Sequence, residues 1–263
     1  MTDEQKALID QLLTALGHDP RIKSAWLSGS FGRGAGDAWS DIDLTLVVAE
    51  EHISACLADY SAPRPDMPPL AFFQTLYGRV LTAITTDWRR FDLAFLTPPE
   101  LARQDGGSLR HLLGDPTKPA ERPGPGASDA PTRLSALIAE FLRVMGLAPV
   151  AFGREEWIVA RQGVELLRNM TVDLMVEEAG LAPAARGVKR LNPFLTPGQR
   201  QVLEALPSPP PEPEALLQAQ VAIAAAFMSH ARPLAAKLGA NWPTALEEAT
   251  RRHLRAALDF DLP

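Results

Sequence analysis

Two acidic residues at the start of an apolar run are the clearest chemical feature of the sequence. Asp41 and Asp43 stand two apart in S-D-I-D-L-T-L-V-V, where β-branched and aliphatic residues without a helical period predict a strand over residues 41–48. Residues two apart on a strand share a face, so we expect both carboxylates to point the same way while Ile42 and Leu44 enter the core. Neighbouring carboxylates repel each other unless a cation lies between them, so this pair predicts a metal site.

A glycine-rich turn precedes this strand. Gly29 and Ser30 follow the apolar run A-W-L, and the loop beyond them holds three more glycines and Arg33. Glycine lets backbone N–H groups approach an anion closely, a serine hydroxyl adds a donor, and a short helix after the turn would direct its positive end at the anion. Arg33 would add a charge-assisted contact. These residues predict a phosphate site beside the carboxylates.

A third acidic residue lies further along the chain. Asp92, in R-R-F-D-L-A-F-L-T, lies in a predicted strand over residues 90–97, which follows another over residues 79–86 after a short turn. If this strand neighbours the one that carries Asp43, the carboxylates meet at one sheet edge and would hold one or two Mg²⁺ ions. Such ions offset charge on a triphosphate, lower the pKa of an attacking hydroxyl and stabilise the leaving oxygen, which suits phosphoryl or nucleotidyl transfer. The alternative is that these aspartates are solvated surface residues.

The surrounding elements alternate between helix and strand. Thr2 and Gln5 have the spacing of a capping box, and the apolar residues after them repeat with a helical period as far as Gly17. A strand is expected over residues 22–28 and a second helix over residues 50–60, ended by a proline-rich loop. We therefore predict an α+β N-terminal domain with a small mixed sheet and a terminal hairpin.

The second half of the chain has a different pattern. Five prolines and few apolar residues between positions 114 and 131 predict a linker. Beyond it, periodic Leu/Ala-rich segments predict five helices, over residues 133–146, 155–179, 197–206, 214–238 and 244–258. We therefore divide the chain into a catalytic domain over residues 1–128 and an all-α, acceptor-binding domain over residues 129–263.

Composition narrows the classes of function. Hydrophobic residues make up 46% and charged residues 22% of the chain, as in soluble globular proteins. A net charge of −6 argues against general nucleic-acid binding. We find no apolar run that approaches the length of a membrane span and no secretory signal. The single cysteine, Cys56, excludes an intramolecular disulfide and fits a reducing cytosol, so we expect a cytoplasmic protein.

Together these motifs resemble a known family. G-S-F-G-R-G, followed by D-I-D and by a later strand with F-D-L, resembles the polymerase-β-like nucleotidyltransferase superfamily over roughly residues 20–100. The resemblance implies roles for five residues: triphosphate binding by Gly29 and Ser30, and Mg²⁺ ligation by Asp41, Asp43 and Asp92. The two-domain plan is similar to that of aminoglycoside and lincosamide nucleotidyltransferases. It implies transfer of a nucleoside monophosphate, with ATP as the expected donor of AMP, to a hydroxyl of a small molecule such as an antibiotic.

Two residues of the helical half are candidates for the same site. Glu165 would take the proton of the acceptor hydroxyl, a role that related enzymes give to a carboxylate; Glu155 and Glu156 are the reserve candidates. The favoured alternative for the Glu165 stripe, which includes Arg168, is a solvated face with intrahelical ion pairs. Lys189 would reach the triphosphate, the alternative being a surface basic pair.

Other chemistries find less support in the sequence. There is no P-loop motif, the glycines lack the spacing of a dinucleotide-binding fingerprint, and the five histidines lack ligand spacing. Two other functions remain open: modification of protein or RNA, as in toxin–antitoxin nucleotidyltransferases, and a non-catalytic nucleotide-binding regulatory module. The acceptor, the preferred nucleotide and the assembly state, a homodimer included, are not encoded in any motif.

Overall fold

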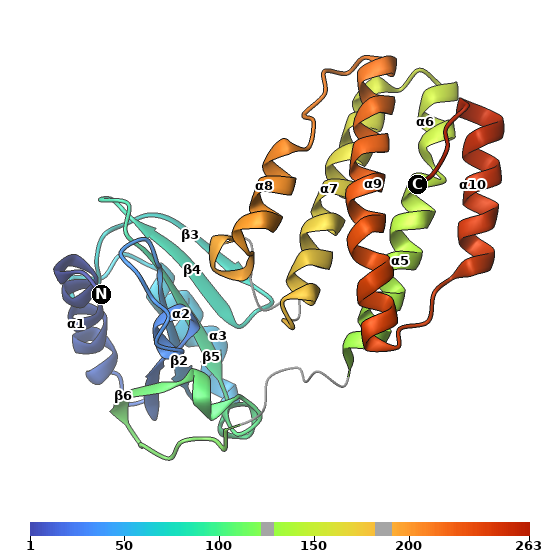
Figure 1. Cartoon of the computed structure of the whole chain (residues 1–263). Helices are drawn as coiled ribbons and strands as arrows, with labels where there is room; N and C mark the ends of the chain where they lie inside the picture. Colours follow the sequence, from blue (N-terminus) through green and yellow to red (C-terminus); the bar gives the residue numbers. More distant parts are fainter. Residues whose placement is uncertain (122–128, 182–190) are drawn as a thin grey trace. The chain divides into compact units, whose positions relative to one another are not determined.

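The computed structural model describes residues 1–121, 129–181 and 191–263. The chain divides into two compact units, Met1–Gly124 and Pro125–Pro263 (Figure 1). The first unit combines a sheet with helices and the second is helical, which confirms the predicted fold class. The assignment of catalysis to one unit and acceptor binding to the other stays a prediction.

The N-terminal unit is built on one mixed sheet of six strands, in the order β3-β4-β5-β2-β1-β6. The strands are β1 Ser24–Leu27, β2 Ile42–Val47, β3 Leu70–Leu76, β4 Val80–Thr85, β5 Arg90–Leu96 and β6 Arg110–Gly114. Its helices are α1 Asp3–Gly17, α2 Gly29–Gly32, α3 Ile53–Ser61 and α4 Pro98–Leu101. β2 and β5 run parallel, whereas the other neighbours are antiparallel. The predicted hairpin is confirmed as β4–β5.

Helices α1 and α3 share one apolar core with the sheet. The core joins Leu12 of α1 and Tyr60 of α3 to Phe91 of β5 and to Ile42 and Leu44 of β2. The last two are 1% and 0% exposed, which confirms that they point inward. The predicted capping box of α1 is also present, since the side chains of its N-cap and third residue each accept an N–H from the other's backbone. Period-two patterning thus assigned the buried face of β2 correctly.

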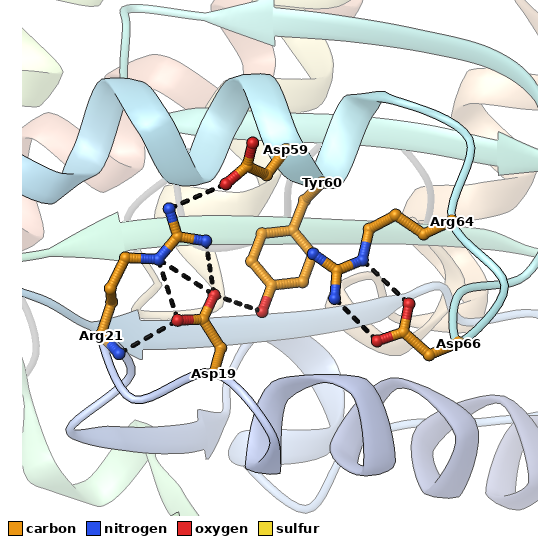
Figure 2. A network of polar contacts seen from close by, with 6 residues as sticks. All are labelled: Asp19, Arg21, Asp59, Tyr60, Arg64 and Asp66. Atoms are coloured by element: carbon orange, nitrogen blue, oxygen red, sulfur yellow. Dashed lines mark hydrogen bonds and ion pairs between the residues drawn. The ribbon is translucent and has the colours of Figure 1, made fainter.

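A polar network ties the C-terminal end of α1 to α3 (Figure 2). The Asp19 carboxylate accepts N–H groups of Arg21 at 2.6 to 3.2 Å and the hydroxyl of Tyr60 at 3.1 Å. Arg21 also pairs with Asp59 at 2.8 Å, and the Arg64 guanidinium lies over the Tyr60 ring. The guanidinium of Arg21 lowers the pKa of Asp19 to about 2. The network fixes the chain as it enters β1, and β1 leads to the glycine turn.

Several elements of this unit were not predicted. β3 is an edge strand with Phe72 and Phe73 both about half exposed, so its two faces do not alternate in polarity. β6 ends at Gly114, which the sequence analysis had placed in the linker. The strand that carries the aspartate pair begins at Ile42, so Asp41 precedes it by one residue.

The second unit consists of helices around a separate core. They are α5 Ala130–Met145, α6 Ala148–Gly153, α7 Trp157–Glu178, α8 Pro197–Ala205, α9 Pro213–Leu238 and α10 Thr244–Leu258. The five predicted helices are confirmed, and α6 is additional. Phe141 of α5 and Phe227 of α9 stack in the core with ring centroids 3.7 Å apart. Beside this core, the almost fully buried Glu177 carboxylate pairs with Arg133 at 2.6 Å.

One segment of this unit corrects the sequence analysis. Ala130–Gly153 is long and apolar enough to cross a membrane, by length and composition alone, although no such run was expected. A core helix of a globular domain passes the same test. Here Leu134, Ile138 and Phe141 of the segment are fully buried in the helical core, and 39% of its most apolar window is buried.

Candidate active site

Two of the predicted metal ligands lie side by side. β2 and β5 are neighbours, as predicted, and Asp43 and Asp92 are register partners across this parallel pair. Adjacent strands lie about 4.8 Å apart, and partners in register share a face. Because Ile42 and Phe91 enter the core, the alternation places both carboxylates on the opposite face, where each residue is half-buried. Backbone pairing therefore brings together two groups of like charge.

The third predicted ligand lies at the start of the same strand. Asp41 is half-buried and directly precedes β2. Within residues 1–121, 129–181 and 191–263, no three His, Cys, Asp or Glu side chains form a group placed to hold a metal ion. Mg²⁺ ligation by Asp41, Asp43 and Asp92 therefore stays a prediction, although oxygen ligands of this kind are those that Mg²⁺ prefers.

The glycine turn rests directly on one of these carboxylates. Gly29 has a φ of 57°, and a Cβ at this position would lie 1.8 Å from Oδ2 of Asp43. The backbone N–H of Ser28 donates to the carbonyl of Asp43 at 2.8 Å. Any side chain at position 29 would displace the carboxylate and strain the backbone. This contact explains why a glycine stands at this position and links the predicted phosphate turn to the predicted metal site.

Ser30 supplies a buried hydroxyl that the described part of the fold does not use. Its Oγ is buried and has no hydrogen-bond partner among the residues the structure describes. Leaving a buried hydroxyl unsatisfied costs roughly 1–3 kcal/mol, so such groups in folded proteins call for an explanation. Because this oxygen belongs to the residue after Gly29, a ligand bound beside Asp43 could complete its hydrogen bonding. The residues present therefore fit an anion next to a cation site.

The remaining predicted residues are placed less directly. Arg33 is the exposed C-cap of α2, and its backbone N–H donates to the carbonyl of Gly29 at 3.3 Å. Lys189 lies outside the described residues. Roles for these two in binding a triphosphate stay predictions.

Glu165 lies on α7, in the helical unit. It lines a surface groove of about 570 Å³ together with polar and apolar side chains of the same helix, among them Arg161, Gln162 and Leu166. Arg168, its neighbour at 3.9 Å, donates to the carbonyls of residues 203, 206 and 207 at the C-terminal end of α8. The Arg168 side chain is therefore structural, whereas the role of Glu165 as a base stays a prediction.

A larger groove, of about 750 Å³, lies along residues 61–73 and includes none of the predicted site residues. It is bounded by the proline-rich loop and β3. Its larger volume alone does not identify it as the active site. The carboxylates and the unsatisfied hydroxyl are the better guide, because they can recognise a charged ligand.

Sequence reasoning missed the residues that hold the loop between the turn and β2. The Gln5 amide donates two hydrogen bonds of 2.9 Å, to the carbonyls of Asp37 and Ser40. Arg90 donates to the carbonyl of Trp39 at 3.1 Å. The capping box had indicated a role for Gln5 in α1, but nothing in the sequence indicated these longer-range bonds.

Comparison with known proteins gives matches only among solved structures. An aminoglycoside 6-adenyltransferase from Bacillus subtilis matches at 13% identity and a TM-score of 0.41, over 96% of this chain and 98% of that one. A nucleotidyltransferase-like protein from Exiguobacterium sibiricum 255-15 matches at 13% identity and a TM-score of 0.35, over 97% and 88%. A CdnC:HORMA-deltaN complex from E. coli MS115-1 matches at 13% and 0.28, over 99% and 90%. No protein-family model and no curated protein matches.

At 13% identity and TM-scores of 0.28 to 0.41, these matches carry no activity over to this chain.

Proposed function

We propose that the N-terminal unit transfers a nucleoside monophosphate from a nucleoside triphosphate, with ATP as the expected donor, to a hydroxyl of a small molecule. The observation that carries the proposal is the register pairing of Asp43 with Asp92 beside the Gly29 turn. Two carboxylates brought together by the backbone, next to an unsatisfied buried hydroxyl at Ser30, suit a metal–triphosphate complex.

The transfer itself exchanges one bond at phosphorus for another. The acceptor oxygen forms a bond to the α-phosphorus, the bond from that phosphorus to the oxygen bridging the β-phosphate breaks, and pyrophosphate leaves. The acceptor proton passes to a base, for which Glu165 is the candidate. Asp41, Asp43 and Asp92 would hold Mg²⁺, which when bound offsets the negative charge of the triphosphate and of the leaving oxygen.

The glycine turn would bind the triphosphate. The Ser30 hydroxyl would donate to a phosphate oxygen, and so gain the partner it lacks within the described parts of the fold. The absence of a side chain at Gly29 leaves the Asp43 carboxylate in place against the turn. The acceptor would be an aminoglycoside, a lincosamide or another hydroxylated molecule, and the helical unit is the proposed acceptor-binding domain.

The test is transfer of label from α-labelled ATP with Mg²⁺ to a panel of aminoglycosides, lincosamides, RNA and cell lysate. Asp43→Asn and Asp92→Asn should each lower transfer by at least about 100-fold. Loss of a residue that only supports a metal ligand costs about 10- to 100-fold in activity, and loss of a ligand should cost at least as much. Asp59→Asn is the matched control: this aspartate lies on α3, half exposed, and should transfer at the wild-type rate.

Transfer that survives both substitutions would overturn the proposed mechanism. Metal-dependent binding of ATP without transfer to any acceptor would instead favour a regulatory nucleotide-binding module. Transfer of label to RNA or protein alone would show that the acceptor is a macromolecule and not a small molecule.

A further inference from the structure

One exposed aromatic residue lies at the edge of the candidate site. Trp39 belongs to the loop that joins the glycine turn to β2, and it is 86% exposed. Large aromatic side chains stabilise a fold mainly through the apolar area that they bury. A tryptophan held almost wholly in solvent gives up this stabilisation and is unusual. An exposed tryptophan can serve as a preformed binding surface when the loop that carries the tryptophan is fixed by other contacts.

The loop is locked by hydrogen bonds within it. The Asp37 carboxylate accepts the backbone N–H of Trp39 at 3.0 Å and the hydroxyl of Ser40 at 2.9 Å. The Ser40 hydroxyl oxygen in turn accepts the backbone N–H of Asp37 at 3.0 Å. These bonds close a tight turn around Trp39.

Side chains from two other elements fix the turn to the rest of the unit. Gln5 of α1, which is buried, donates to the carbonyls on either side of the tryptophan, those of Asp37 and Ser40. Arg90 of β5 donates to the carbonyl of Trp39 itself. The backbone of the loop is therefore held by three hydrogen bonds from side chains of two elements, while the indole remains exposed.

The position of this loop relates it to both carboxylates. Trp39 stands two residues before Asp41 and four before Asp43, and its carbonyl is bound by Arg90, two residues before Asp92. Since β2 and β5 are parallel neighbours, their first residues lie at the same end of the two strands. Trp39 thus lies at the strand end at which the predicted metal ligands lie, with its side chain exposed.

We propose that Trp39 stacks on the base of the nucleoside triphosphate; this inference rests on the proposed function. A nucleoside triphosphate bound at Ser30 and Asp43 brings a flat aromatic base with it, whereas a sugar-like acceptor has none. Aromatic side chains stack on any base because every base has a π face, and a side chain that is already ordered loses little freedom on binding. The structure offers the ring on a loop that is fixed before the ligand arrives.

Trp88 is the other tryptophan exposed near this edge, and it is the less suitable one. It is 75% exposed and lies in the β4–β5 turn. Its backbone N–H bonds to Thr85 within that turn, and no described bond connects it to β2. Trp39, in contrast, is joined through its loop to both strands that carry the aspartates.

The test compares two ligands, MgATP and inorganic tripolyphosphate with Mg²⁺, by titration calorimetry. Trp39→Ala should weaken ATP binding by about 5- to 150-fold, the range expected for loss of one stacked base, and leave tripolyphosphate binding unchanged. Trp39→Phe, which keeps an aromatic face, should recover most of the affinity. Tyr77→Ala is the matched control. Tyr77 is 94% exposed in the β3–β4 turn, which lies at the end of β4 away from the β4–β5 turn and from the start of β5.

Four results would overturn the inference: unchanged ATP affinity in Trp39→Ala, an equal loss for both ligands, no recovery in Trp39→Phe, or a loss confined to Trp88→Ala. The failure of the proposed function is a separate result. Base-dependent ATP binding without transfer to any acceptor would overturn the proposed function alone, whereas full ATP affinity in a transfer-competent Trp39→Ala would overturn the stacking alone.

Discussion

Asp19 and Asp43 are two aspartates of the same unit that differ in the neighbours described for them. Asp19 is paired with a guanidinium and a phenol, both within hydrogen-bonding distance, and its pKa falls to about 2 (Figure 2). Asp43 has a second carboxylate, Asp92, beside it on the next strand. Pairing of unlike charges stabilises the fold, whereas carboxylates gathered side by side oppose folding unless a cation joins them.

This difference distinguishes an acid that stabilises the fold from the acids that we propose as metal ligands. Burial alone does not, since Asp19 is more buried than Asp43 and is fully explained by its partners. The helical unit repeats the structural case in the pair of Arg133 with Glu177. A cluster of like charge, imposed by strand register, is the feature that calls for a ligand.

The largest expected effects come from the two aspartates themselves: one substitution should cost activity and the other stability. Asp43→Asn should lower nucleotidyl transfer at least about 100-fold and affect stability less than Asp19→Asn does. Asp19→Asn should lower the free energy of unfolding by roughly 2–3 kcal/mol, the value implied by its pKa shift, and leave transfer by the folded protein intact. Urea unfolding and a transfer assay on both variants measure this. The comparison fails if both variants lose only stability.

The next prediction concerns the glycine turn. Gly29→Ala should push the Asp43 carboxylate aside and reduce transfer by about 100-fold, with about 1–2 kcal/mol of backbone strain from the φ of 57°. Gly34→Ala is the matched control, because Gly34 has a φ of 72° but an added Cβ would meet nothing within 4 Å. The control should lose similar stability and keep its activity. Equal activity in the two variants would contradict a role for the Gly29–Asp43 contact.

A smaller effect is expected from pH. The folded-state pKa of Asp19, about 2, lies below its ordinary value of 3.8, so the unfolded chain binds more protons between these values. The stabilisation is therefore present above about pH 4 and is lost as the pH falls towards 2, by roughly 2 kcal/mol. Unfolding of wild type and Asp19→Asn across this range should show a slope that the variant lacks. A slope that persists unchanged in the variant would assign it to other carboxylates.

Local patterns explain which parts of the fold were predictable. The period of the apolar residues in α1 and β2, and the capping box at Thr2, depend on neighbours in sequence, and these predictions are confirmed. β3 escaped prediction because an edge strand with both faces exposed has no alternation to detect.

The site depends more on long-range pairing. Asp43 and Asp92 were candidates from their strand settings, but their register follows from the parallel pairing of β2 with β5, which no local motif encodes. The two amide donors of Gln5 reach residues more than 30 positions away, so its capping spacing disclosed only half of its role. Acceptor recognition is harder still, because it depends on how side chains combine in space rather than on a motif.

The smallest expected effect concerns the loop that carries Trp39. Gln5→Glu preserves the capping box, in which glutamate serves as well as glutamine, but removes both N–H donors that hold the loop carbonyls. The looser loop should raise the KM for ATP by about 3- to 10-fold, with kcat changed less, because only part of the roughly 1 kcal/mol of each lost bond reaches the ligand through the loop.

Thr2→Ala is the control for this substitution. It removes the cap and should lower stability by about 1 kcal/mol while leaving KM unchanged, because Thr2 does not touch the loop through any described bond. If Gln5→Glu and Thr2→Ala raised KM equally, general loosening of α1 would explain the effect. A rise in the KM for ATP that is confined to Gln5→Glu would separate the positioning of the loop from the stability of α1. Gln5 would then be one side chain that both stabilises the fold, through the cap, and positions the proposed binding loop.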